Sequence, residues 1–285
     1  MLSYRHAFHA GNHADVLKHF VLMQVIAHAT QKDKPFWYID THAGAGQYLL
    51  DAGYATQNAE YESGIAKLWN ESDLPQPLLN YVGFIKTLNQ PSSPKTAKLS
   101  MYPGSPLCAK ALLRADDRMR LFELHPSDFD ILRENFKGHQ RTVKIDMSNG
   151  FAGIKAILPP PRRAVVLIDP PYEEKQDYQR VIDMIKDSLH RFATGTYIVW
   201  YPLLQRPEPH QMVEKLKQLD LKSWLNVSLK VQEPSIEGFG MYGSGLFIVN
   251  PPWTLPNTLN EVMPYLTEKL AVDDGANFEI DSHIS

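Results

Sequence analysis

The chain has a single cysteine, Cys108, among its 285 residues. No internal disulfide framework is possible, so a reducing, cytoplasmic setting is expected. No apolar run reaches the roughly 18 residues that span a membrane, and the first residues, MLSYRHAFHAGNHADV, lack the apolar core of a signal peptide. The formal net charge of −3 excludes a strongly basic protein. Any nucleic-acid partner must therefore be recognised through local positive charge.

The composition is that of an ordinary globular protein, with 44% hydrophobic and 21% charged residues. Short apolar runs alternate with amphipathic stretches, which predicts an α/β fold with a mostly parallel sheet and helices on both faces. The expected strands are Phe36–Asp40, Met119–Leu124, Val165–Asp169, Thr196–Trp200 and Leu246–Asn250. The expected helices are His13–Thr30, with Asn12 as N-cap, Pro106–Arg114, Pro126–Phe136 and Asp177–Phe192.

Residues 47–98 interrupt the alternation of strand and helix. They contain surface-type helical stretches and turn signals such as Asp73-Leu74-Pro75, which we interpret as a helical insertion after the first strand. Residues 1–46 and 99–270 are then expected to form the α/β domain, with an amino-terminal arm for substrate or cofactor. Residues 271–285 are polar and acidic, and a poorly ordered tail is expected there.

A short glycine loop, residues 40–46 (DTHAGAG), follows the first expected strand. It lacks both the full dinucleotide fingerprint and the P-loop pattern, so it is either a tight turn or a loop on which a nucleoside cofactor lies, with Gly44 in contact. Glu123 ends the next apolar strand, where it is either a solvated side chain or a ligand of ribose hydroxyls. A cofactor with ribose but no pyrophosphate, such as S-adenosylmethionine, fits both features.

The stretch VVLIDPPYEE, residues 165–174, ends an apolar strand in an acid, two prolines and an aromatic residue. The prolines fix the backbone without adding N–H donors. The carboxylate of Asp169 and the carbonyl of Pro170 are placed to accept both N–H groups of a planar amine, and Tyr172 offers a ring for a base to stack on. This pattern suits methyl transfer to an exocyclic amine or an amide, although a rigid turn would also explain it.

A second stretch of this kind, Asn250-Pro251-Pro252-Trp253, follows a later apolar strand. Asp169 is preferred as the catalytic residue because its strand should lie beside the cofactor at the centre of the sheet. The strand before Asn250 is expected to be the last one, antiparallel and away from the site.

The amino-terminal segment is dense in histidine. His9 and His13 at first suggest zinc, but no cysteine or second carboxylate completes a site, so no metal is expected. We interpret Lys18 and His19 as lying near a carboxylate, such as that of the cofactor's methionine end. Tyr4 and His6 would then lie on an arm near the substrate.

Together the motifs resemble one known family. YRHAFHAGNHADVLKH (4–19), DTHAGAGQY (40–48), YPGSP (102–106), ELHPSD (123–128) and LIDPPYE (167–173) are similar to those of the RlmJ family, bacterial 23S ribosomal RNA adenine-N6 methyltransferases. The resemblance implies a Rossmann-like class I methyltransferase fold and S-adenosylmethionine as donor. The implied partner is 23S ribosomal RNA, free or in an early assembly intermediate, and a monomer without membrane association is expected.

The resemblance also implies roles for individual residues. Asp169 would be catalytic, with His6 arranging the target base and Tyr4 facing the RNA. Cofactor contacts are expected from Lys18, His19, His42, Ser105 and Glu123. After the third strand the register is open, so either Asp146 or Asn149 with Gly150 would contact the cofactor's adenine.

Other functions remain open at this stage. DNA adenine and protein glutamine are alternative acceptors for the Asp-Pro-Pro-Tyr pattern, and a noncatalytic RNA-binding module or a metal-dependent hydrolase are alternatives of another class. Candidate phosphate contacts are Arg5, Lys18, Arg162, Arg163 and Arg191.

Overall fold

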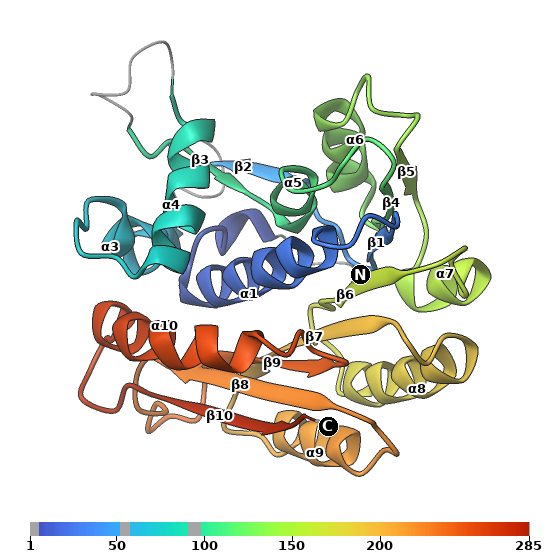
Figure 1. The fold of residues 1–285 in the computed structure, drawn as a ribbon. Helices are drawn as coiled ribbons and strands as arrows, with labels where there is room; N and C mark the ends of the chain where they lie inside the picture. Colours follow the sequence, from blue (N-terminus) through green and yellow to red (C-terminus); the bar gives the residue numbers. More distant parts are fainter. Residues whose placement is uncertain (1–5, 52–57, 91–97, 285) are drawn as a thin grey trace.

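The central element is one eight-stranded sheet. The computed structural model describes residues 6–51, 58–90 and 98–284. The strands of the sheet are β1 (Trp37–Asp40), β4 (Arg118–Phe122), β5 (Val143–Asp146), β6 (Ala164–Ile168), β7 (Thr196–Leu203), β8 (Trp224–Lys230), β9 (Gly243–Val249) and β10 (Asn277–His283). Their order across the sheet is β10-β8-β9-β7-β6-β1-β4-β5, as Figure 1 shows.

The five strands β5, β4, β1, β6 and β7 pair in parallel, and β9 is antiparallel to both of its neighbours. This is the Rossmann-like arrangement of class I methyltransferases, and it confirms the predicted fold class. All five expected strands are present with small shifts of their ends. The chain reverses its winding at β1, which has β4 on one side and β6 on the other, and ligands bind at such a switch point.

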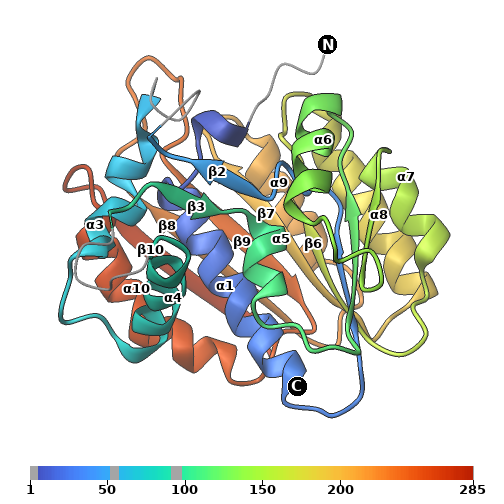
Figure 2. The ribbon, with the colours of Figure 1, turned by 90° about the horizontal axis from the view of Figure 1, so that it is seen from above.

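Helices cover both faces of the sheet (Figures 1 and 2). One face carries α1 (His13–Thr30), α5 (Ser105–Lys110), α6 (Pro126–Asn135) and α10 (Leu255–Leu270), and the other carries α7 (Gly150–Ile157), α8 (Gln176–Arg191) and α9 (Glu208–Lys217). Continuously apolar strands such as β6, buried along its whole length, are expected when both faces are covered.

Helix α1 is buried on nearly all sides. It has the predicted bounds, and the Asn12 side chain caps it by accepting hydrogen bonds from the N–H groups of Ala14 and Asp15. The helix packs against α5 and β9 and contacts β6 and α4 (Gln76–Leu88). Polar residues of α1 are therefore buried with it, and three of them return in the site described below.

The segment after β1 is helical for most of its described length. It starts, however, with β2 (Gln47–Leu49), which pairs with β3 (Met101–Pro103) in a separate two-stranded sheet. Between them lie η2 (Glu60–Ser63), α3 (Ile65–Trp69) and α4. Apolar residues of α3 and α4 belong to the same buried cluster as α1. The insertion therefore packs against the helix that carries the amino-terminal histidines.

The second proline pair and Asp169 lie at opposite ends of the strands of the sheet. Asn250 follows β9, whose last residue, Val249, pairs with Tyr197 at the start of β7. Its side chain donates to the carbonyls of Ala193 and Gly195 at 2.9 and 2.7 Å. The predicted antiparallel, off-site placement is confirmed, and Asn250 closes a turn. Its strand is not the last one, because β10 follows.

The expectation of a poorly ordered tail is wrong. Residues 277–283 form β10, which pairs along its whole length with β8. Phe278 and Ile280 point toward the core and are partly buried there, whereas the residues between them are exposed. The period-two alternation of the tail, hidden by its polar composition, is what a one-face-buried edge strand requires.

Removal of residues 276–285 should lower the free energy of unfolding by about 1.5–3 kcal/mol, since two half-buried large side chains contribute about half of what fully buried ones do. Denaturant unfolding measures the loss. Deletion of residues 284–285, beyond the last paired strand residue, serves as the control. Equal stability of the long deletion and the full chain would contradict the role of β10.

Candidate active site

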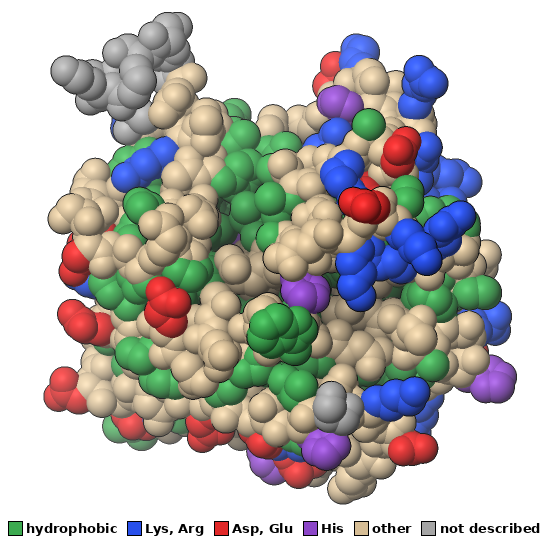
Figure 3. Space-filling view, viewed as in Figure 1, with side chains coloured by type: hydrophobic (Ala, Val, Ile, Leu, Met, Phe, Trp, Pro, Cys, Tyr) green, Lys and Arg blue, Asp and Glu red, His purple; other side chains and the backbone are tan. Residues whose placement is uncertain are grey.

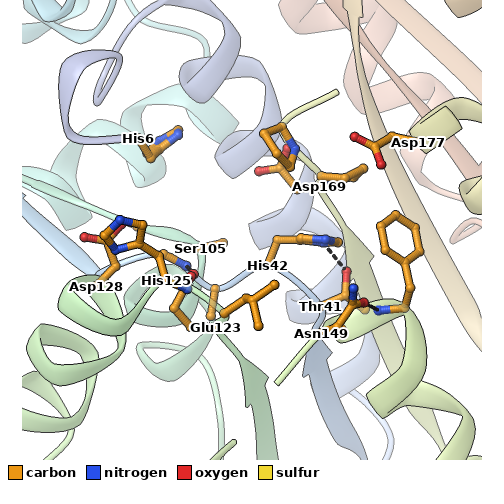
Figure 4. A pocket seen from close by; sticks show the side chains of 18 of the residues that line it. His6, Thr41, His42, Ser105, Glu123, His125, Asp128, Asn149, Asp169 and Asp177 are labelled. Carbon is orange, nitrogen blue, oxygen red and sulfur yellow. Dashed lines mark hydrogen bonds between the residues drawn. The ribbon is translucent and has the colours of Figure 1, made fainter. Parts of the chain in front are cut away.

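A cavity of about 260 Å³ opens at the carboxyl ends of β1, β4, β5 and β6. Figure 4 shows Glu123, His125 and Asp128 on one side of it, with His42 and Asn149 nearby and His6 and Asp169 across from them. Predicted site residues on its wall are His6, Lys18, His19, His42, Gly44, Ser105, Glu123, Asn149, Gly150, Asp169 and Pro170. Segments far apart in the sequence thus meet at the switch point of the sheet.

The glycine loop is held against the end of β4. The N–H of Gly44, which has a φ of +60°, donates to Glu123 Oε2 at 2.8 Å, and the N–H of His125 donates to Glu123 Oε1 at 2.7 Å. Burial raises the pKa of Glu123, against the effect of these two N–H donors. The carboxylate therefore fixes the loop and also forms part of the cavity wall.

A buried acid, Asp40, supports the floor of the cavity. It accepts hydrogen bonds from Tyr38 Oη and Ser105 Oγ, both at 2.7 Å, and from the N–H of His42 at 3.2 Å. Burial raises the pKa of Asp40 to about 6. Burial also lowers the pKa of His42 to about 3, so its imidazole is neutral at physiological pH. Its Nδ1 lies 2.8 Å from Thr41 Oγ1.

Lys18 lies between two carboxylates. Its Nζ is 2.8 Å from Asp15 Oδ1 and 2.7 Å from Asp169 Oδ2. Burial lowers the pKa of Lys18, but the charges of Asp15 and Asp169 outweigh that effect and raise it. Burial raises the pKa of Asp169, and Lys18 opposes this shift. The ammonium thus joins the amino-terminal helix to the tip of β6.

The other oxygen of Asp15 organises the start of the chain. Asp15 Oδ2 lies 2.9 Å from His6 Nε2 and accepts the N–H of Gly11 at 2.9 Å. His19 contributes one more link, with Nδ1 at 2.9 Å from Tyr102 Oη, and burial lowers the pKa of His19 to about 3. His6 is therefore positioned on the cavity wall. Tyr4 and Arg5 lie outside the described residues.

A second cavity, of about 210 Å³, lies on the other side of Asp169. The two cavities share His6, Lys18, Asp169 and Pro171 on their walls. Other residues of the second wall are His9, Asn12, Ala14, Asp15, Tyr172, Trp200, Pro202, Leu204, Arg206 and Met241. Asp169 thus borders both cavities.

Tyr172 lines the second cavity but not the first. Its φ of +52° is unusual for a non-glycine residue, and its hydroxyl donates to the carbonyl of Trp200 at 2.7 Å. The ring stands 4.5 Å from that of Tyr178, centroid to centroid. Only about 3% of Tyr172 is exposed, so its side chain forms a fixed part of the cavity wall. The neighbouring Trp200 is a second aromatic candidate for a base contact.

The two alternatives that the sequence left open after the third strand differ in their position relative to the first cavity. Asn149 and Gly150 line the first cavity, and the Asn149 side chain caps α7 by accepting the N–H of Phe151. Asp146 is not on that wall, and its carboxylate pairs with Arg120 and Lys144. This arrangement favours Asn149 and Gly150 as the contacts to a ligand.

Two of the amino-terminal histidines, His6 and His9, are paired with carboxylates. His9 Nδ1 lies 2.8 Å from Glu60 Oε1, and burial lowers the pKa of His13 to about 4. Among the described residues, no group of three or more His, Cys, Asp and Glu side chains is arranged to hold a metal ion. The same residues contain no helix long and apolar enough to cross a membrane.

Two of the candidate phosphate contacts are held in structural roles by the protein itself. Lys18 is engaged by buried carboxylates, and the guanidinium of Arg163 donates to the carbonyls of Lys34 and Ala29, next to the loop that precedes β1. Lysine and arginine side chains do gather on one side of the face drawn in Figure 3, over β4, β5 and α7. Positive charge is thus local, as the net charge requires.

Sequence reasoning missed Asp15, Asp40 and Trp200. Asp15 precedes Lys18 by three residues on a helix, a spacing that brings two side chains together, and this was an available signal. The sequence shows that Asp40 ends its strand. Its burial beneath Ser105, however, depends on the packing of α5. Nothing in the sequence separates Trp200 from any other strand tryptophan.

Comparison with known proteins decides the family. The family model described as "RsmJ: Ribosomal RNA large subunit methyltransferase D, RlmJ" matches residues 33–280. The chain is 46% identical over 283 residues to Ribosomal RNA large subunit methyltransferase J of Haemophilus influenzae, covering 99% of this chain and 98% of that one. The chain belongs to the RlmJ family. As in other methyltransferases of this fold, the methyl donor is S-adenosylmethionine.

Two further relatives agree with this membership. The Escherichia coli protein of the same name is 46% identical over 271 residues, covering 95% of this chain and 94% of that one. A solved structure from Legionella pneumophila has a TM-score of 0.86 at 36% identity, and covers 96% of this chain and 98% of that one. The RlmJ fold therefore extends over nearly the whole chain.

Replacement of Lys18 by methionine should destabilise the protein by about 3–5 kcal/mol at pH 8, because two buried carboxylates lose their cation. Their folded-state pKa values would then rise, and a raised carboxyl pKa costs stability as pH increases. The loss should shrink toward pH 5. Lys18 itself contributes its full stabilisation throughout this range, because that contribution is lost only as pH rises above the unfolded pKa of lysine.

Urea unfolding of both proteins at pH 5 and pH 8 measures the difference. Lys137→Met is the control, because Lys137 forms an exposed pair with Glu134 and should change stability little at either pH. A Lys18→Met loss that is the same at both values would show that the carboxylates are neutralised by other groups.

Proposed function

We propose that the protein methylates the exocyclic N6 of an adenosine in 23S ribosomal RNA. The observation that carries this proposal is the position of Asp169, which lies between two cavities. The first is assigned to the cofactor and the second to the target base. The named relatives are large-subunit ribosomal RNA methyltransferases, which supports RNA as the acceptor in preference to DNA or a protein glutamine.

The first cavity has the chemistry that S-adenosylmethionine requires. Glu123 offers carboxylate oxygens for ribose hydroxyls, while Leu124 and Phe151 give the wall apolar surface for an adenine near Asn149 and Gly150. Polar groups for the methionine end come from a different side of the same wall, through Lys18, His19, His42 and Ser105. When bound, the cofactor supplies an electrophilic methyl group on a sulfonium sulfur.

The second cavity suits a flat base. Its wall combines Trp200, Tyr172 and two prolines, Pro171 and Pro202, with the polar group Asp169 at the junction with the first cavity. Aromatic walls stack on nucleobases. An adenine held there would direct its amino group toward Asp169, and RNA presents such a base only when it is unpaired or flipped out of a helix.

Asp169 and Pro170 act by orientation. A carboxylate and a proline carbonyl that accept the two amino N–H groups turn the nitrogen lone pair toward the methyl group, and alignment supplies much of the rate. Asp169 also accepts the proton that nitrogen releases after the transfer. Lys18 holds the Asp169 carboxylate in place through its 2.7 Å contact, and His6 borders the same junction.

The proposed substrate also indicates which form of the RNA the protein binds and in which compartment it acts. We propose free 23S ribosomal RNA or an early assembly intermediate as partner, because an adenosine must leave its stack to reach the second cavity. The enzyme would act as a monomer in the cytoplasm, where ribosomal RNA is processed. Tyr4 would contact the RNA from the amino-terminal arm.

Replacement of Asp169 by asparagine should lower kcat by about 10²–10⁴-fold, since one amino proton loses its charged acceptor. Protein-free 23S ribosomal RNA and labelled S-adenosylmethionine serve as substrates, and nucleoside digestion identifies the product. Wild-type protein should yield N6-methyladenosine. Label only in DNA or protein would reject the RNA assignment, and a fully active Asp169→Asn variant would reject the catalytic role.

Replacement of Glu123 by glutamine should raise the dissociation constant for S-adenosylmethionine about 10-fold, because a charged acceptor of ribose hydroxyls becomes neutral. Isothermal titration calorimetry measures this constant. Asp146→Asn is the matched control, since Asp146 lies off the cavity wall, and its affinity should equal that of the wild type. A larger rise in the dissociation constant for Asp146→Asn than for Glu123→Gln would show that Asp146, and not Glu123, contacts the cofactor.

A further inference from the structure

The loop between β8 and β9 exposes apolar side chains at its tip. Ile236 has a relative exposure of 105% and Phe239 of 82%, the two highest values among large hydrophobic side chains in the described part of the chain. Two adjacent exposed groups of this size are unfavourable in water unless something covers them in use. Residues 231–242 are therefore a candidate contact surface.

This loop stands at the rim of the second cavity. Met241, two residues after Phe239, lines that cavity together with Leu204 and Arg206 from the facing segment. The loop is tied to the same segment, since Gln205 Nε2 donates to the carbonyl of Ser235 at 2.7 Å. Figure 2 shows it projecting from the edge of the sheet where η1 (His6–Phe8) also lies. The apolar tip thus belongs to the loop that supplies Met241 to the wall of the proposed base site.

The charge of the loop argues against a phosphate contact. Residues 231–242 contain no lysine or arginine and two acids, Glu233 and Glu237. Lys230 pairs with Glu233 at 2.8 Å. A surface without cations cannot neutralise an RNA backbone, so an RNA that passes here would be held through the faces of its bases.

We infer that Phe239, beside Ile236, stacks on an unpaired nucleobase that neighbours the target adenosine. This rests on the proposed function, since the second cavity is assigned to that adenosine. RNA is the occupant because the loop that carries the apolar tip also lines the cavity, and a nucleotide chain that enters the cavity must leave across its rim. Every base offers a flat face to an aromatic ring, so the contact tolerates different sequences.

The backbone on both sides of Phe239 has a conformation that favours glycine. Gly238 and Gly240 flank it with φ values of +78° and +90°, which residues with a side chain rarely adopt. Nothing lies within 4 Å of a Cβ placed at Gly240. Gly240 therefore serves the shape of the turn, not close packing, whereas a Cβ at Gly238 would lie 3.3 Å from Gln205 Oε1.

Replacement of Phe239 by alanine should raise the KM for 23S ribosomal RNA about 5- to 100-fold, the range expected for one stacked base. The dissociation constant for S-adenosylmethionine and kcat at saturating RNA should not change. Trp253→Ala is the matched control. Trp253 is also exposed, at 71%, but it follows β9, at the opposite end of that strand from the loop that carries Phe239. It should leave KM unchanged.

Two further variants separate stacking from general apolar contact. Phe239→Trp should keep the wild-type KM, whereas Phe239→Leu should behave like alanine. A wild-type KM in Phe239→Ala or in Phe239→Leu would overturn the inference, as would a concentration-dependent dimer of the wild type that Phe239→Ala abolishes. If the wild type methylates no RNA at all, the proposed function fails instead, and that result is distinguishable in the same assay.

Discussion

The contact of Lys18 with Asp15 and Asp169 is the interaction on which the site depends. An ammonium buried between two carboxylates compensates charges that none of the three groups could hold alone in a low-dielectric interior. It also joins two parts of the chain 151 residues apart in sequence, the amino-terminal helix and the end of β6. The loop that follows β6 and the amino-terminal segment are thereby linked through one ammonium group.

This constraint explains why α1 is so deeply buried. The helix lies against the sheet, α5 and the inserted helices, and the buried side chains of Asp15, Lys18 and His19 each have a polar partner there. Asp15 contacts His6 and the backbone N–H of Gly11 in the amino-terminal segment, and it also pairs with Lys18 on the wall of the first cavity. The insertion contributes by packing on α1, so it stabilises the site without supplying most of its groups.

The division of space around Asp169 follows from topology. Parallel strands that wind in opposite directions from β1 leave a crevice at their carboxyl ends, and the two prolines after Asp169 prevent the chain from filling it. One cavity forms over the glycine loop, and the other forms between the start of α1, the loop that follows β6 and the end of β7. A transfer between two ligands needs adjoining cavities, because the acceptor atom and the donor group must come into contact.

The sequence by itself determined five strands of the sheet, the bounds of α1 and the residues that end the central strands. These follow from hydrophobic periodicity, capping and proline, all of which act over a few neighbouring residues. The family resemblance added the reaction that the comparisons support. The sequence could also separate Asp169 from Asn250, because the order of strands places only one of them at the centre.

Only the tertiary structure decided which polar groups share a space. The pairing of Asp15 with Lys18 and Asp169, the position of Asn149 in place of Asp146, and the second cavity behind Tyr172 depend on side chains from distant segments. The tail shows the same limit, since residues 277–283 form a strand because β8 offers an unpaired edge. Composition describes a segment alone, whereas burial depends on what the fold places beside it.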